Sequence, residues 1–470
     1  MPKGIPANQV VETLRRHMLV DGFDNLIVDL ERSHGSYLVD QVSGKEYLDF
    51  FTFFATSPVR YDHPKIHSNE FKEAIYRAAI HNVSNSDFYT VQMAEFVKAM
   101  EDVAIREDLT RLFLVSGGGL AVENAFKAAF DWKAKRNIAR GIWKGSWEEI
   151  DKTHAKQMKI IGFKESFHGR TGYTLSITQT YDPRKWALFP KFDWPKFDNP
   201  CLKFPLTPEV ISSTEKMEER ILGEIRDYIQ KNKDYVAGMI IEPIQAEGGD
   251  KHFRDQWFTE LRQLAEENDF MLIYDEVQTG MGLTGKMWCW EHFGSSARPD
   301  IVAFGKKFQI CGILVGDKIN QAKYNVFSDE MDNDMGVAPG VARLNSTWGG
   351  SLVDMVRATY YLRIVEEEKL LDNATEMGEY LLKHIQDMEQ EFPEVSNARG
   401  RGLMCAFDMP DHASRDLLFN TLIGRELLVL KCGEKTMRFR PHLDVTKEDI
   451  DKCMGIIKET IRELRMDHEI

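Results

Sequence analysis

A glycine-rich turn, an aspartate and a lysine each come directly after a short apolar run of this sequence. SGGG at 116–119 follows LFLV, Asp275 follows FMLIY, and Lys306 follows DIVAFG. If these apolar runs are strands of an open α/β sheet, their carboxyl ends meet where such sheets bind ligands. The sequence therefore predicts one site that combines an anion cradle, an acid and an amine.

The turn at 116–119 has the composition of a phosphate site. Its three glycines let the backbone approach an anion closely, and the helix expected after it directs free N–H groups at the same point. A phosphate monoester is the natural guest, although the turn taken alone also fits a plain flexible loop. The segment does not match GxxxxGK[ST], which argues against a Walker-type nucleotide site.

Lys306 and Asp275 fit the chemistry of a carbonyl cofactor that contains a pyridine ring. A lysine that forms a Schiff base must be partly neutral, and desolvation at the rim of a sheet lowers its pKa. The freed amine can then move protons on the substrate. A buried aspartate must be paired or neutral, and a pyridinium N–H is a suitable partner for it.

Each of these residues also has an ordinary interpretation when it is taken alone. Lys306 fits a solvated surface lysine, and Asp275 fits a helix cap or a structural salt bridge. The combination of glycine turn, strand-end acid and strand-end lysine favours the cofactor site. Lys307, the next residue, is expected to point elsewhere.

The apolar runs themselves indicate how the site is built. They lie at 112–115, 159–163, 237–241, 270–274 and 300–304, and helical segments such as FTELRQLAEEN separate them. Short, nearly continuous apolar runs of this kind are typical of strands buried on both faces of a largely parallel sheet. The expected fold class is α/β, with a doubly wound, mainly parallel sheet.

The two ends of the chain have a different texture. A polar helix at 7–18 and a short antiparallel strand pattern open the chain, and two long amphipathic helices, short strands and a last helix follow residue 351. We predict an N-terminal segment of a small α+β domain at 1–65, a large cofactor-binding domain at 66–350, and the rest of the small domain at 351–470. The acidic, aperiodic stretch at 317–344 is predicted to be a long functional or interface-forming surface loop.

Bulk composition excludes some classes of partner. The 470 residues have a formal net charge of -14, which argues against nucleic acid or an anionic membrane as the main partner. The six cysteines show neither CxxC pairs nor histidine spacing, so we expect reduced thiols and no metal site. No apolar run approaches the roughly 20 residues of a membrane span, and the N-terminus lacks a signal-peptide core. We expect a cytoplasmic protein.

Several motifs together resemble a known family. They occur in the order and spacing of class III (omega) aminotransferases of fold type I, from about residue 25 to the end: SGGGLAVENAFK, ESFHGRTGYTLS, IIEPIQAEGGD, DEVQTGMGLTGKMW, DIVAFGKK, NSTWGG and MRFRP. The resemblance implies pyridoxal 5'-phosphate as the cofactor. FPKFDWPKFDNP, FGKKFQICG and LNSTWGGSLVDMVR resemble the lysine 6-aminotransferases within that class. Eukaryotic 4-aminobutyrate aminotransferases are the nearest competitor.

The resemblance implies a set of residues that hold the cofactor. Lys306 would form the Schiff base, and Asp275 would pair with the pyridine nitrogen. The other positions that match the family are Gln278 near the ring hydroxyl, Gly118 and Gly119 at the phosphate, Phe167 stacked on the ring, and Thr347, which would reach the phosphate across the interface of a homodimer.

Three further positions would select the substrate. Arg170 would bind the far carboxylate and Arg438 the near one, as guanidinium groups suit carboxylates. Glu247 would pair with Arg438 when the reacting end of the substrate has only an amine, and would move aside for a dicarboxylate. Singly, each residue also fits a surface ion pair of little value. Arg440, two residues beyond Arg438, is a possible helper.

The implied reaction moves the ε-amino group of L-lysine to 2-oxoglutarate and yields L-glutamate and 2-aminoadipate 6-semialdehyde. A 4-aminobutyrate or ornithine aminotransferase is the alternative within the enzyme class. A catalytically idle member of the fold, used for binding or scaffolding, is the alternative outside it, and the intact Lys306, Asp275 and Glu247 argue against that alternative.

Overall fold

A seven-stranded sheet forms the centre of the computed structural model, which describes residues 4–22, 26–320, 326–327, 343–467 and 470. The strand order is β3-β9-β8-β7-β6-β4-β5, and the pairs from β5 to β8 are parallel. β9 runs antiparallel to both of its neighbours. The strands are β3 (Arg111–Val115), β4 (Lys159–Phe163), β5 (Lys196–Phe197), β6 (Val236–Ile241), β7 (Met271–Asp275), β8 (Ile301–Phe304) and β9 (Cys311–Val315).

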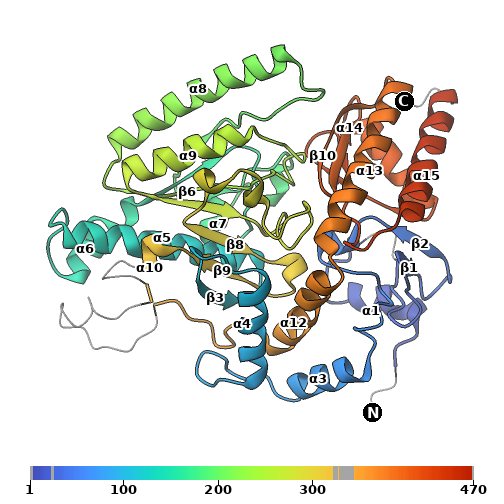
Figure 1. Ribbon diagram of the computed structural model, residues 1–470, viewed down its shortest axis with the longest axis horizontal. Coiled ribbons are helices and arrows are strands. Elements are labelled where there is room, and N and C mark those ends of the chain that lie inside the picture. The colour runs from blue at the N-terminus through green and yellow to red at the C-terminus, as the bar shows by residue number, and fades with distance from the viewer. Residues whose placement is uncertain (1–3, 23–25, 321–325, 328–342, 468–469) are drawn as a thin grey trace.

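Both faces of this sheet are covered by helices, as the apolar runs predicted. Ile240 and Ile273 pack with the buried face of α5 (Gly118–Ala139). Their neighbours Ile241 and Tyr274 point to the opposite face, in the core that includes α8 (Pro208–Lys231) and α9 (Asp255–Asn268). Figure 1 shows α8 and α9 on one side of the sheet and α5 on the other. The doubly wound α/β fold is confirmed.

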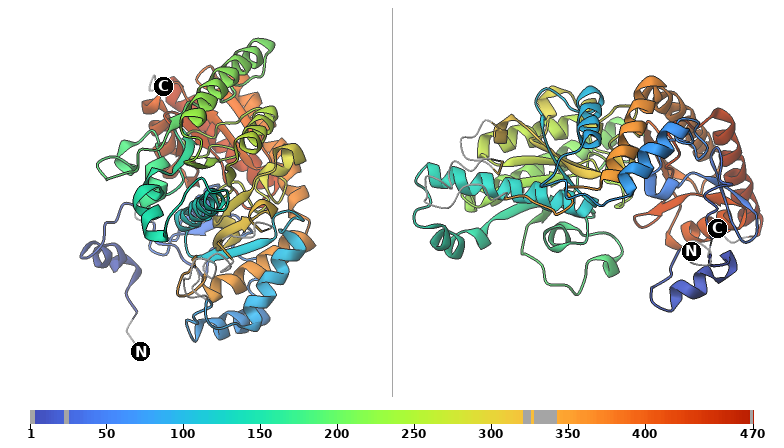
Figure 2. Two further views of the ribbon diagram at one scale, coloured as in Figure 1. Left: turned by 90° about the vertical axis from the view of Figure 1, so that its left-hand side faces the viewer. Right: turned by 90° about the horizontal axis from the view of Figure 1, so that it is seen from below.

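A second group of strands joins the two ends of the chain. β2 (Glu46–Asp49) pairs antiparallel with β1 (Tyr37–Val39) and parallel with β12 (Leu427–Leu428). The right-hand view of Figure 2 shows the N-terminal segment beside the C-terminal one. A separate antiparallel sheet has the order β10-β11-β14-β13, with β10 (Ser396–Arg401), β11 (Met404–Asp408), β13 (Leu430–Cys432) and β14 (Thr436–Arg438). The domain boundaries after residues 65 and 350 stay predictions.

The helices begin where the sequence supplies caps. The Thr207 side chain accepts from Val210 N at the start of α8, and Pro208 occupies the first turn. Thr446 and Asp449 form a capping box at the start of α15. The remaining helices of the described residues are η1 (Ala7–Gln9), α1 (Val10–Arg15), α2 (Thr52–Ala55), α3 (Asn69–Ala79), α4 (Val91–Val103), α6 (Trp147–Thr153), η3 (Ala155–Gln157), α7 (Gly172–Ile177), η4 (Pro183–Lys185), η5 (Cys289–His292), η6 (Ser295–Ala297), η7 (Lys306–Phe308), α10 (Asp317–Asn320), α12 (Leu352–Glu367), α13 (Leu370–Glu391), α14 (His412–Gly424) and α15 (Lys447–Met466).

Three details differ from the sequence prediction or fall outside the structure. Strands β5 and β9 were not predicted, and β9 inserts between β3 and β8. The N-terminal helix is shorter than 7–18, since α1 ends at Arg15. Of the stretch at 317–344, α10 covers the first residues, whereas 321–325 and 328–342 lie outside the described residues. Within the described residues, every helix is too short or too polar to cross a membrane.

Candidate active site

A cavity of about 840 Å³ lies beyond the carboxyl ends of the parallel strands. It brings together the three strand-end groups that the sequence singled out, namely the glycine turn after β3, Asp275 at the end of β7 and Lys306 after β8. Its lining includes nine of the ten predicted site residues: Gly118, Gly119, Phe167, Arg170, Glu247, Asp275, Gln278, Lys306 and Arg438. Thr347 is the tenth, and it does not line this cavity.

The glycine turn is shaped so that only glycine fits at its centre. Gly117 has a φ of +125°, and α5 begins at the next residue, so the first N–H groups of the helix face the cavity. A Cβ placed on Gly118 would lie only 2.9 Å from Val277 Cγ1, whereas one on Gly119 would make an ordinary contact of 3.6 Å with Gly169 Cα. These residues form a narrow cradle of backbone donors that suits a phosphate group.

Asp275 is buried at the end of β7 with one partner on each oxygen. Oδ1 accepts from the Val277 backbone N–H at 3.1 Å, and Oδ2 accepts from His168 Nδ1 at 2.8 Å. His168 Nε2 is itself buried and has no hydrogen-bond partner among the described residues. Sequence reasoning missed His168, because a histidine beside the motif's phenylalanine carries no signal of a contact with a residue more than 100 positions away.

Lys306 is half-buried, and its Nζ lies 3.5 Å from Gln278 Oε1. Burial lowers the pKa of this amine to about 8; the positive charge of Arg438 adds to the effect, and the negative charge of Asp275 opposes it. Lys307 points away, as expected, and donates to the Ser57 carbonyl at 2.9 Å. Lys306 therefore offers a substantial fraction of neutral amine near physiological pH.

Arg438 and Glu247 form an ion pair on the far side of the same cavity. The Arg438 side chain is only 2% exposed, and its terminal nitrogen donates to Glu247 Oε2 at 2.8 Å. The other Glu247 oxygen is paired with Lys185. Burial alone would raise the pKa of Glu247, but the charges of Arg438 and Lys185 outweigh it and lower the pKa. Glu247 thus stays ionised and occupies the face of Arg438 that a substrate carboxylate would need.

The other two arginines have contrasting positions. Arg440 is fully buried and binds Asp250 through two nitrogens, at 2.6 and 2.8 Å. Both terminal nitrogens of Arg440 bind that carboxylate and the residue does not line the cavity, so a role for Arg440 as a helper of Arg438 stays a prediction. Arg170 is exposed at the cavity and has no ion pair among the described residues; its guanidinium carbon lies 6.0 Å from the centre of the Phe167 ring.

Phe53 and Phe54 line the cavity, and the backbone conformation of their segment was not predicted from the sequence. All four residues of Thr52–Ala55 have a positive φ, between 42° and 66°, and none of them is glycine. A left-handed conformation costs about 1–2 kcal/mol for each such residue, so neighbouring contacts must hold it. Gln278 supplies one contact by donating to the Phe54 carbonyl at 3.1 Å.

Glu242 connects two of the loops that carry site residues. Its Oε1 accepts from the Phe167 backbone N–H at 2.9 Å, and its Oε2 accepts from Ala246 N at 3.0 Å. Burial raises the pKa of this carboxyl to about 7. Through these two contacts Glu242 fixes the loop of Phe167 to the loop of Glu247.

Thr347 lies on the surface of the chain, next to a loop that contains several exposed aromatic residues. Its carbonyl accepts from Ser84 Oγ at 2.8 Å and Ser86 Oγ at 3.1 Å. Phe88, Tyr89 and Trp348 are 50–81% exposed in this region. The role of Thr347 at the phosphate of a second copy stays a prediction.

Comparison with known proteins fits this geometry. Residues 20–461 match the family model described as aminotransferase class-III. The chain belongs to this family. It is similar to the L-lysine-epsilon aminotransferase of Mycobacterium tuberculosis, with 43% identity over 456 residues that cover 97% of this chain and 95% of that protein. It is also similar to the mitochondrial 4-aminobutyrate aminotransferase of Mus musculus, with 33% identity over 430 residues, 88% of this chain and 80% of that one.

The backbone agrees with a solved structure as well. The lysine aminotransferase from M. tuberculosis in the internal aldimine form superposes with a TM-score of 0.88 and 42% identity, over 98% of this chain and 100% of that one. The cofactor of this class-III aminotransferase is pyridoxal 5'-phosphate. The residues of the cavity fit it: a glycine cradle that a Cβ would fill, a buried acid at a strand end, and a lysine of lowered pKa.

Proposed function

We propose that this aminotransferase moves the ε-amino group of L-lysine to 2-oxoglutarate, which gives 2-aminoadipate 6-semialdehyde and L-glutamate. The observation that carries the proposal is the unequal state of the two cavity arginines. Arg170 has no ion pair among the described residues, whereas Arg438 is covered by Glu247 at 2.8 Å. A substrate with a carboxylate at its far end and only an amine at its reacting end fits that arrangement.

Each residue then has a defined task. The guanidinium of Arg170 binds the far carboxylate, and Glu247 neutralises Arg438 while an amine-only end occupies the site. When a dicarboxylate enters, its second carboxylate takes the place of Glu247 on Arg438. These tasks explain how one cavity accepts lysine through its side chain and 2-oxoglutarate through its keto-acid end.

The cofactor, when bound, supplies an aldehyde for the amine and a ring that accepts the electrons released from the substrate carbon. Lys306 holds the cofactor through its amine and, once freed, takes the proton from the substrate carbon and returns it. Asp275, supported by His168, keeps the ring nitrogen protonated. Gly118 and Gly119 would bind the phosphate, Phe167 would stack on the ring, and Gln278 would lie near the ring hydroxyl.

The protein is proposed to act as a homodimer in the cytoplasm. Thr347 of each copy would reach the phosphate of the other, and the exposed Phe88, Tyr89 and Trp348 beside it support an interface there. The six cysteines, all within the described residues, are free thiols, as is usual in a reducing compartment. Mixing Lys306→Ala and Thr347→Val chains tests the shared site: activity should reappear in the mixture, and its absence would refute the sharing.

The substrate assignment is tested by turnover of lysine, ornithine and 4-aminobutyrate with 2-oxoglutarate, coupled to detection of glutamate. We expect kcat/KM for lysine to exceed the other two values by about tenfold or more, since differences in chain length change the fit of the carboxylate to Arg170. A higher kcat/KM for ornithine or 4-aminobutyrate would reject the assignment.

A further inference from the structure

Lys185 is a second cation on Glu247, and nothing in the sequence pointed to it. The Lys185 ammonium pairs with Glu247 Oε1 while Arg438 pairs with Oε2, so one carboxylate bridges two cations. We propose that Lys185 is a positioning residue that retains the Glu247 carboxylate when a dicarboxylate substrate takes over Arg438, and that it thereby sets the affinity for the dicarboxylate. This inference rests on the proposed function, in which Glu247 exchanges with a substrate carboxylate.

Lys185 is held at this point by the short helix η4. The Asp182 side chain caps the helix by accepting from Arg184 N at 3.0 Å, and it also binds the Arg184 guanidinium at 2.8 Å. Trp186 Nε1 donates to the Thr180 carbonyl at 2.9 Å and anchors the other end of the turn. Lys185 is therefore the cation of this turn that is directed at Glu247, while its neighbour Arg184 is neutralised locally.

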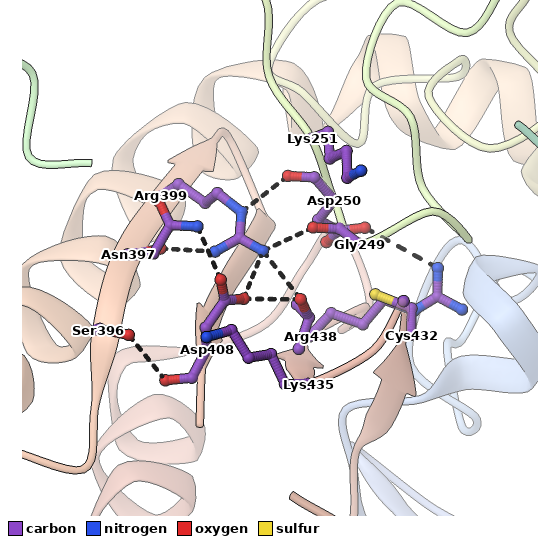
Figure 3. Close-up of polar contacts among 12 residues, drawn as sticks. Gly249, Asp250, Lys251, Ser396, Asn397, Arg399, Asp408, Cys432, Lys435 and Arg438 are labelled. Atoms are coloured by element: carbon purple, nitrogen blue, oxygen red, sulfur yellow. Dashed lines mark hydrogen bonds and ion pairs between the residues drawn. The ribbon is translucent and has the colours of Figure 1, made fainter. Parts of the chain in front are cut away.

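The backbone that carries Glu247 is fixed, so an exchange must be a rotation of its side chain. The Glu247 carbonyl accepts from Gly433 N at 2.9 Å. Buried Arg399 donates to the carbonyls of Gly249 at 2.6 Å and Asp250 at 2.9 Å, and to Asp408 at 2.8 Å. Figure 3 shows this clamp between β10, β11 and the 249–250 segment, next to Arg438. These contacts hold the loop in place, so we assign the separation of Glu247 from Arg438 to rotation of the Glu247 side chain.

The rotated side chain has space on the side of Lys185. Glu247 and Lys185 line both the cofactor cavity and an adjoining outer cavity of about 1280 Å³, which opens between η4, α14 and the turn at 430–433. Their side chains are 22% and 27% exposed. A carboxylate that leaves Arg438 can thus turn outward without losing contact with Lys185.

The net charge around Glu247 explains why Lys185 should affect the affinity for a dicarboxylate. Arg438, Lys185 and Glu247 together have a net charge of +1, and the adjacent Arg440 and Asp250 cancel each other. A second substrate carboxylate brings the cluster to zero. Without Lys185 the cluster would start at zero and become negative, with Glu247 partly buried and without a cation, which is costly. A substrate whose reacting end is only an amine does not require this exchange.

The test uses the holoenzyme and the glutamate half-reaction, because a carboxylate of glutamate must bind Arg438 whatever the amine donor is. Lys185→Met should raise the KM for glutamate and the dissociation constant of unreactive glutarate about tenfold. kcat should change little, and the KM of the amine donor should stay within about twofold. Lys185→Arg should restore the glutamate KM, and Arg184→Met, the matched control on the same turn, should leave it unchanged.

A double-mutant cycle separates the positioning role from direct contact with substrate. In the Glu247→Gln background there is no carboxylate to retain, so adding Lys185→Met should have less than about a twofold effect on the glutamate KM. An equal effect in both backgrounds, or an unchanged KM in the single variant, would overturn the inference. If the unaltered enzyme reacted with glutamate but not with lysine, the substrate proposal would fail while the result for Lys185 stood.

Discussion

Lys306 should behave as an amine that is half neutral near pH 8. Its pKa falls from 10.5 to about 8, chiefly because burial removes hydration from the ammonium form. At pH 7 the neutral fraction is then about 10%, against about 0.03% for a solvated lysine, an increase of about 300-fold. The neutral fraction rises with pH, so the reactivity of Lys306 toward an acylating reagent should reach half of its maximum near pH 8.

Two substitutions should move that midpoint in opposite directions. The Arg438 cation lowers the pKa of Lys306, so Arg438→Met should move the midpoint upward. The Asp275 carboxylate favours the ammonium form, so Asp275→Asn should move the midpoint downward. Burial would remain in both variants, and neither midpoint should return to that of a solvated lysine.

Competition labelling of the cofactor-free protein with trace acetic anhydride measures this directly. Peptide mass spectrometry follows each lysine between pH 6 and pH 11, and exposed Lys203 serves as the internal reference for a solvated amine. A Lys306 profile that coincides with that of Lys203 would refute the desolvation argument. A downward shift in Arg438→Met, or an upward one in Asp275→Asn, would refute the assignment of the charges.

Three other substitutions test separate parts of the site. Gly118→Ala places a Cβ 2.9 Å from a valine methyl and should weaken cofactor binding about tenfold or more by fluorescence titration, whereas Gly172→Ala, with nothing within 4 Å, should not. Arg440→Met removes the two short contacts of the buried Asp250 carboxylate, which keeps only Arg438 at 3.8 Å, and should lower the free energy of unfolding in urea by about 3–5 kcal/mol. Arg184→Met, on the surface, should leave that free energy nearly unchanged. Arg170→Met should raise the KM for lysine about 10- to 100-fold in steady-state assays with a smaller change in kcat; an unchanged KM would remove Arg170 from the substrate site.

The sequence predicted the elements that have a clear period and a local signal. The buried strands could be predicted because they are short, apolar and followed by polar residues. Lys306 and Asp275 could be predicted because each directly follows such a strand. Strand β9 was not predicted, because CGILV begins only a few residues after Lys306 and no helical segment separates it from the preceding strand. A connection this short cannot contain a crossover helix, so β9 pairs antiparallel with β8.

Residues that act through long-range contacts were less accessible. His168 meets Asp275 and Lys185 meets Glu247 across 107 and 62 positions of the chain, and pairs at such separations have no periodic or local signature. The left-handed turn at Thr52–Ala55 could not be predicted either, since TFFA contains no glycine that would indicate a positive φ. Its conformation is imposed by tertiary contacts such as the one from Gln278.

The identity of the lysine that holds the cofactor is tested most directly by borohydride reduction of the purified holoenzyme. Reduction fixes the cofactor to the amine that bears it, and peptide mass spectrometry then locates the added mass. We predict a single modified residue, Lys306, and loss of the label in Lys306→Ala. A label on Lys307 or any other lysine, or an unchanged label in Lys306→Ala, would contradict the account.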